Sequence, residues 1–112
     1  MTDTDPVTVI CKFVVKPGKE EEMKGLLAKH WPTLHRLGMT TDEPARVYQG
    51  VAAPEGERSH DLGANVFVEI FSWKDRRQSS LAHQSPDVLS VWEPMGAICE
   101  HMEFPHFERV EL

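Results

Sequence analysis

The chain has 112 residues, of which 40% are hydrophobic and 27% are charged, and its formal net charge is −6. This length suits one domain with its own hydrophobic core and leaves no room for two. The acidic balance argues against nucleic acid or an anionic membrane as a partner. The densest basic group is interrupted by Asp75 and is typical of a solvated helix start; it consists of Lys74, Arg76 and Arg77.

The compartment is predicted from the N-terminus and the cysteines. The first six residues are polar and acidic and lack the basic start and apolar run of a signal peptide. No apolar run approaches the roughly 20 residues that cross a bilayer. Cys11 and Cys99 each lie beside an isoleucine and are interpreted as buried thiols rather than a disulfide. We therefore expect a cytoplasmic protein with a flexible N-terminus (1–6) and a single domain (7–112).

The first half of the chain predicts a strand, a helix and a second strand. Residues 7–15 are rich in β-branched and aromatic side chains, and both faces of this strand are apolar apart from Lys12. Residues 19–37 place apolar side chains at helical spacing and begin with acidic residues that suit the positive end of a helix. Pro32 within this run predicts a kink or a new segment. The second strand is expected at residues 46–53.

The second half predicts a strand, helical segments and a last strand. A polar loop at residues 54–63 is expected to be the most mobile segment, and residues 65–73 form the clearest strand. A short helix follows at residues 75–83. Ser85 and Pro86 then resemble an N-cap and a first helical position, and they begin an apolar stripe that continues to Met102 with a kink at Pro94. Residues 104–112 are expected to form an edge strand, because they contain Pro105.

This order predicts an α+β domain of the ferredoxin-like kind, β-α-β-β-α-β, with a four-stranded antiparallel sheet and helices on one face. Alternation in the third strand separates its valines and Ile70 from a second set of side chains: Phe67, Glu69, Phe71 and Trp73. In water, three such rings would leave a large apolar patch. We therefore expect a homodimer in which a second copy covers the face of these four residues.

Several short motifs, spread over the chain from Val7 to Leu112, carry a resemblance to a known family. They are Lys16 to Glu22 after the first strand, Glu43-Pro44 before the second, Tyr48 within it, Phe67 to Asp75 across the third, and His83 in the following helix. Together they resemble the antibiotic biosynthesis monooxygenase group of the dimeric α+β barrel superfamily. The pattern departs from the family at Ala45, where a glycine is usual, and in the long polar loop at 54–63.

Glu69 and His83 are the candidate catalytic residues. Glu69 shares its face with aromatic rings, where a carboxylate often marks a functional cleft. The structural alternative is an ion pair with Lys12 or Arg46. The resemblance places His83 at the rim of the cleft, and an imidazole can transfer protons near neutral pH; the alternative is helix packing or a cap contact. The expected substrate-binding residues are Lys12, Arg46, Tyr48, Phe67, Phe71, Trp73 and Trp92.

The resemblance implies a monooxygenase that acts on a small aromatic or quinone-like metabolite without a bound cofactor, because the substrate supplies the electrons. The first alternative is a non-catalytic dimeric binding module whose cleft is filled by its own side chains. The second is a haem-binding or haem-degrading protein. Trp73 fits that branch, but the first strand has no asparagine and Trp92-Glu93 stands where its histidine is expected.

A metal site is not expected. Four potential ligands lie close together in the sequence, but their spacing matches no catalytic signature and Phe104-Pro105 breaks any helix between them. They are interpreted as a polar strand edge: His101, Glu103, His106 and Glu108.

Overall fold

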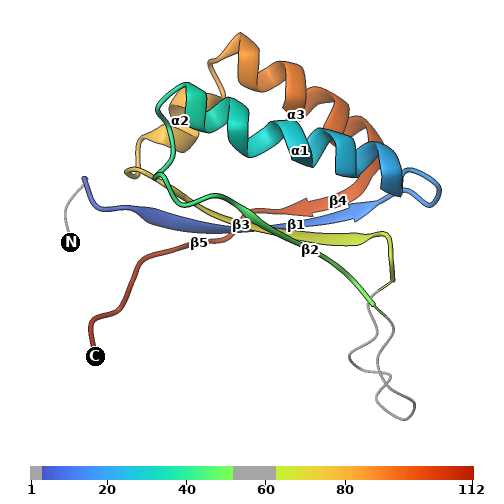
Figure 1. Ribbon diagram of the computed structural model, residues 1–112, viewed down its shortest axis with the longest axis horizontal. Coiled ribbons are helices and arrows are strands. Elements are labelled where there is room, and N and C mark those ends of the chain that lie inside the picture. Colours follow the sequence, from blue (N-terminus) through green and yellow to red (C-terminus); the bar gives the residue numbers. More distant parts are fainter. Residues whose placement is uncertain (1–3, 52–62) are drawn as a thin grey trace.

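The computed structural model describes residues 4–51 and 63–112, so the predicted loop at 54–63, apart from Gly63, and the first three residues of the predicted N-terminal tail lie outside the described residues. The strands are β1 (Val7–Val15), β2 (Arg46–Gln49), β3 (Val66–Trp73), β4 (Cys99–Glu103) and β5 (His106–Phe107), and the helices are α1 (Glu20–Arg36), α2 (Gln78–Ala82) and α3 (Pro86–Ile98). The sheet is antiparallel in the order β2-β3-β1-β4, and β5 also pairs with β1. Figure 1 shows all three helices on one side of this sheet. The predicted ferredoxin-like α+β fold is therefore confirmed.

The helix boundaries follow from local chemistry. α1 begins with three glutamates beside the exposed N–H groups of its first turn. The Ser85 side chain accepts a hydrogen bond from the backbone N–H of Val88, and Pro86 occupies the first turn of α3, as predicted. Pro32 and Pro94 lie inside continuous helices, so the prediction of a new segment at Pro32 is wrong. Among the described residues, no helix is long and apolar enough to cross a membrane.

The last strand begins earlier than predicted. Cys99 ends α3 in an extended conformation, and β4 pairs with the C-terminal half of β1. Pro105, which has no N–H for a ladder, separates β4 from the two-residue β5. Met102 therefore lies on a strand, although its spacing also matches the apolar stripe of the preceding helix.

The two faces of the sheet have different environments. Across β1 and β3, Val7 lies opposite Trp73, Val9 opposite Phe71, Cys11 opposite Glu69 and Phe13 opposite Phe67. All eight residues are buried, and we call this side the helix-covered face. The alternate residues form the open face, on the side without helices in Figure 1. Its central apolar residues are Ile10, Val14, Val68 and Ile70.

The predicted location of the dimer contact is therefore wrong. Phe67, Phe71 and Trp73 are between 1% and 4% exposed in a single chain, because the helices pack on them. No second copy is needed to cover these rings. The predicted alternation was correct, but the helices cover the opposite face from the one expected. Both faces of β1 are largely apolar, so its pattern could not decide which face lies inside.

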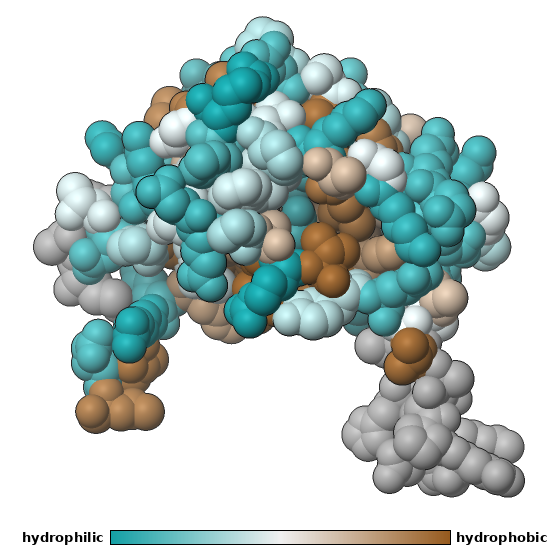
Figure 2. Space-filling model, viewed as in Figure 1, coloured by the Kyte–Doolittle hydropathy of each residue, from teal (hydrophilic) through white to brown (hydrophobic). Residues whose placement is uncertain are grey.

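Apolar surface remains outside the core. Figure 2 shows a mostly hydrophilic outer surface on which apolar residues gather where the helical layer meets the sheet. A shallow groove is lined by residues of α1, of the segment leading into β2 and of β2 itself, including Trp31, Ala45 and Val47. On the open face, Tyr48 and Phe107 are about half exposed. The segment after β5 runs away from the sheet on the side opposite the helices (Figure 1).

Candidate active site

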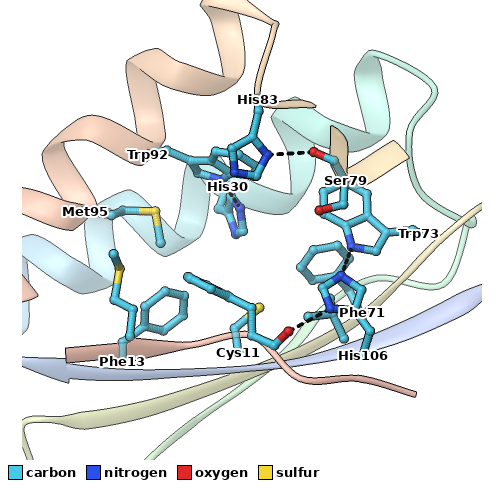
Figure 3. Close-up of a pocket in the computed structure, with 13 residues that line it drawn as sticks. Cys11, Phe13, His30, Phe71, Trp73, Ser79, His83, Trp92, Met95 and His106 are labelled. Carbon is cyan, nitrogen blue, oxygen red and sulfur yellow. Dashed lines mark hydrogen bonds between the residues drawn. The ribbon is translucent and has the colours of Figure 1, made fainter. Parts of the chain in front are cut away.

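A cavity of about 220 Å³ lies between the helical layer and the helix-covered face of the sheet (Figure 3). Its apolar wall is formed by Val9, Phe13, Phe71, Met95, Met102 and Phe104. Its other lining residues carry polar atoms: Cys11, His30, Trp73, Ser79, His83, Trp92 and His106. Residues from both helix layer and sheet thus enclose a space in which a planar apolar ligand would be largely removed from water.

A chain of buried hydrogen bonds supports one side of this cavity. Glu69 on β3 is 0% exposed, and its Oε1 lies 2.6 Å from Nδ1 of His30 on α1. Nε1–H of Trp92 on α3 donates to Nε2 of the same imidazole over 2.7 Å. Three elements of secondary structure are therefore joined through His30.

The donor and the acceptor in each of these hydrogen bonds follow from the indole of Trp92. An indole N–H is only a donor, so Nε2 of His30 must accept, and the proton of the neutral imidazole lies on Nδ1. Nδ1–H then donates to the Glu69 carboxyl group. The second carboxyl oxygen, Oε2, is buried and has no hydrogen-bond partner among the described residues. His30 is thus held as one tautomer with both ring nitrogens occupied.

A second indole–imidazole pair lies on the opposite side of the cavity. Nε1–H of Trp73 donates to Nε2 of His106 over 3.1 Å. Nδ1–H of His106 donates to the Phe104 carbonyl oxygen over 2.7 Å. As with His30, both ring nitrogens of His106 are occupied.

His83 differs from the other two histidines of the cavity. It follows α2, and its Nδ1–H donates to the backbone carbonyl oxygen of Ser79 over 2.8 Å. Its ring packs against that of Trp92 in a T-shaped arrangement, with a centroid distance of 4.8 Å and an interplanar angle of 68°. Its Nε2 has no hydrogen-bond partner within the part of the chain that the structure describes. Because Nδ1 carries the proton, this free nitrogen is a lone-pair acceptor and a potential base.

The local environment also affects a thiol in the cavity wall. Burial, followed by the negative charge of neighbouring Glu69, raises the pKa of Cys11 far above its usual range. Cys11 therefore remains a neutral thiol at physiological pH and is a poor nucleophile. It contributes a small, weakly polar surface to the cavity.

The structure brings together some of the predicted site residues. His83, Phe71, Trp73 and Trp92 line the cavity. Glu69 is next to it but reaches it only through His30. Whether Glu69 and His83 are catalytic stays a prediction.

The other predicted site residues lie elsewhere. Phe67 is buried in the core and does not line the cavity. On the open face, Lys12 lies opposite Val68 and Glu103, Arg46 lies opposite Ile70, and Tyr48 lies opposite Val68. The predicted pairing of Glu69 with Lys12 or Arg46 is therefore wrong, because their side chains project from the opposite side of the sheet.

The four potential metal ligands near the C-terminus do not meet at one point, because Pro105 separates the strand that carries His101 and Glu103 from the strand that carries His106. His101 pairs with Glu103 over 3.1 Å, His106 faces the cavity, and Glu108 accepts a bond from Arg76. Among residues 4–51 and 63–112, no group of three or more histidine, cysteine or acidic side chains could hold a metal ion.

Two histidines of the site, His30 and His106, were not predicted as site residues from the sequence. His30 occupies an apolar position of the α1 stripe and was interpreted only as part of the helix pattern. A histidine in an otherwise apolar stripe is a signal for a buried polar partner, which here is Glu69. His106 was considered only as a metal ligand, and its partner Trp73 is 33 residues away in the chain.

Comparison with known proteins supports the fold. No family model and no curated protein matches the chain. Among solved structures, it resembles a variant of SnoaB, a cofactor-independent oxygenase from Streptomyces nogalater, with a TM-score of 0.72, 20% identity and coverage of 96% of both chains. It also resembles a candidate antibiotic biosynthesis monooxygenase from Bordetella bronchiseptica (TM-score 0.72, 15% identity, 96% of this chain and 99% of that one). PA3566 from Pseudomonas aeruginosa matches with a TM-score of 0.70, 15% identity and coverage of 99% and 100%. The chain therefore has the ferredoxin-like fold of the antibiotic biosynthesis monooxygenase-like structures that its motifs resemble.

Proposed function

We propose that the chain is a monooxygenase that oxidises a small, electron-rich aromatic compound, such as a phenol, without a bound cofactor. The observation that carries this proposal is the apolar cavity with the free Nε2 of His83 at one end. The fold shared with a cofactor-independent oxygenase supports the same reaction class.

The proposed reaction needs only a phenol and O₂. His83 accepts the hydroxyl proton, and the resulting electron-rich phenolate supplies the electrons that reduce O₂. A carbon–oxygen bond forms at the ring carbon para to the hydroxyl group, and the O–O bond then breaks. One oxygen atom stays on the ring as the carbonyl of a quinone. The other leaves as water with the hydroxyl proton and the hydrogen from the para carbon.

The cavity suits this chemistry in two respects. Its aromatic and aliphatic wall removes the ring of the substrate from water, which protects a reactive phenolate and its oxygen adduct from side reactions. The Glu69–His30–Trp92 chain fixes Trp92, and Trp92 in turn packs against His83. In this proposal Glu69 and His30 are positioning residues, and His83 is the base. Positioned bases typically contribute about 10²- to 10⁴-fold to rate.

The test is oxygen consumption with 1-naphthol, together with the appearance of 1,4-naphthoquinone, in protein freed of metals by chelation. We expect turnover by the wild type and a loss of at least about 100-fold in kcat for His83→Ala. His35→Ala is the matched control, because His35 lies on the exposed part of α1 and pairs with Asp42. Equal turnover in the His83→Ala variant and the wild type would contradict the role of His83.

The cavity also helps to distinguish the proposed function from the two alternatives, a binding module and a haem-binding protein. A binding module was expected to have its cleft filled by Phe67, Phe71 and Trp73, whereas Phe71 and Trp73 line an open space and Phe67 lies in the core. A volume of about 220 Å³ is below the roughly 300–1,000 Å³ typical of ligand sites and therefore favours a small ligand over haem. A Soret band on addition of haem would favour the haem-binding alternative instead.

We further propose that the protein is a homodimer whose two open faces pack against each other. Half-exposed aromatic residues and a row of aliphatic side chains occupy this face, and soluble monomers rarely leave such patches uncovered. Val110 and Leu112, which are also exposed, lie in the segment that projects beyond the sheet on the same side (Figure 1). A second copy would bury all of these groups while leaving each cavity on the outer, helical side.

A further inference from the structure

The polar groups in the cavity wall are bonded mainly to one another. Figure 3 shows the indole of Trp92 beside His30 and the indole of Trp73 beside His106, on different sides of the cavity. Each indole N–H donates to an imidazole Nε2. Each imidazole donates its own N–H to a second partner, which is the Glu69 carboxyl group for His30 and the Phe104 carbonyl oxygen for His106. The four rings therefore present no free nitrogen donor or acceptor to a ligand.

The rest of the wall is apolar apart from one end. Cys11 is held as a neutral thiol. The lining residues that keep a free polar side-chain atom are His83 and Ser79, which are adjacent because His83 bonds the Ser79 backbone. Within the described residues, these two side chains form a single strongly polar end, and the rest of the wall offers apolar contacts and the weakly polar thiol of Cys11.

We infer that the site selects aromatic compounds with a hydroxyl group on one ring only, held at His83 and Ser79, and discriminates against a second hydroxyl on the far ring. This inference rests on the proposed function for the class of ligand and adds its orientation and substitution pattern. A second hydroxyl would be buried without a partner, since the indole of Trp92 already occupies His30. The loss of one such hydrogen bond to water corresponds to about 5- to 150-fold in affinity.

The first measurement compares 1-naphthol with 1,5-dihydroxynaphthalene by titration calorimetry under nitrogen, where no oxidation occurs. The two hydroxyl groups of the diol are equivalent by symmetry, so whichever one is held at His83, the other lies toward the far wall. We expect the wild type to bind 1-naphthol at least about fivefold more tightly. Equal or tighter binding of the diol would overturn this inference and leave the proposed function standing. Failure of both compounds to bind would overturn the proposed function itself.

The second measurement tests whether the selectivity depends on the indole N–H group of Trp92. Trp92→Phe removes the donor to His30 and makes room beside it, so Nε2 of His30 becomes free to accept from the second hydroxyl of the diol. We expect the preference for 1-naphthol over the diol to fall at least about fivefold. Trp31→Phe is the matched control, because Trp31 stacks on His35 outside the cavity, and it should keep the wild-type preference.

Trp73→Phe gives an independent test on the other side, because it frees Nε2 of His106. It also covers the case in which Trp92→Phe does not fold, which circular dichroism would reveal. A reduced preference in either folded indole variant supports the inference. An unchanged preference in every indole variant that folds would overturn it.

Discussion

The two faces of the sheet are built from the same strands but are used differently. On the helix-covered face, Glu69 is fully buried among aromatic rings and is tied to α1 and α3 through His30. On the open face, Lys12 lies between Val68 and Glu103 and remains partly exposed. The Glu69 carboxyl group is tolerated on the helix-covered face because a histidine bonds it, whereas the charges of the open face stay near solvent.

The pattern of side chains along a strand shows which residues share a face but not which face is covered. Alternation determines which residues share a face, because successive side chains point to opposite sides of a strand. It does not determine which layer covers that face. The charges of Lys12 and Arg46 were the better guide to the uncovered face, because both residues fall on the open face. Glu69, the charged residue on the covered face, needed a partner from another element.

The largest expected effect is a loss of stability, which should differ between variants on the two faces of the sheet. Phe67→Ala on the helix-covered face should lower the free energy of unfolding by about 3–5 kcal/mol, because it removes a fully buried ring from the core. Urea denaturation measures this loss, which should not depend on protein concentration. Tyr48→Ala on the open face is the comparison. Its smaller loss should grow with protein concentration, because Tyr48 acts through the proposed dimer. The same concentration dependence in both variants would contradict the separation.

The next prediction concerns association. Ile70→Lys places a charge at the centre of the open face, between Ile10 and Arg46, where dimerisation would bury it. We expect the Kd of the dimer to rise at least about 100-fold, which equals about 2.7 kcal/mol. Sedimentation or light scattering measures the change, and circular dichroism checks that each chain is folded. A wild type that is monomeric at micromolar concentration would contradict the proposed dimer.

A smaller effect is expected for thiol reactivity on the helix-covered face. Burial raises the pKa of both cysteines, but Cys99 is only half-buried, whereas Cys11 is closed in by the cavity and lies beside Glu69. Because the thiolate is the reactive form, iodoacetamide at pH 8 should modify Cys99 at least about tenfold faster than Cys11. Mass spectrometry of peptides measures both rates. Adding 1-naphthol should slow modification of Cys11 and leave Cys99 unchanged; equal slowing of both would place the ligand outside the cavity.

Much of the fold was predictable because it depends on local patterns. The N-cap at Ser85, the alternation in β3 and the acidic start of α1 are each set by neighbouring residues. The site was less predictable, because its bonds join distant elements. His30 and Glu69 are 39 residues apart, and His30 and Trp92 are 62 apart. The boundary of β4 was also missed, since Met102 fits both a helical and a strand period and only pairing with β1 distinguishes them.

The smallest expected effect concerns the link between β3 and the cavity. Asp75 follows β3 and accepts hydrogen bonds from the Arg77 backbone and from Gln78, which fixes the start of the segment that carries Ser79 and His83. The Arg77 side chain also donates to the Asp75 carboxylate. This side-chain bond, followed by the bonds from the Arg77 backbone and from Gln78, holds the pKa of Asp75 below its usual range. The unfolded chain therefore takes up this proton more readily than the folded chain, so stability from Asp75 is present above about pH 4 and is lost as pH falls through the lower folded pKa.

Asp75→Asn should accordingly lower the urea midpoint slightly at pH 7, and the difference from the wild type should shrink as the pH falls below about 4. Glu111→Gln is the matched control, because Glu111 forms an exposed pair with Arg109 and should change neither value. A difference between wild type and Asp75→Asn that stays constant from pH 7 to pH 3 would show that the carboxylate charge of Asp75 is not what orders this segment. The order of the α2 segment, and with it the placement of His83 over the helix-covered face, would then have to come from packing alone.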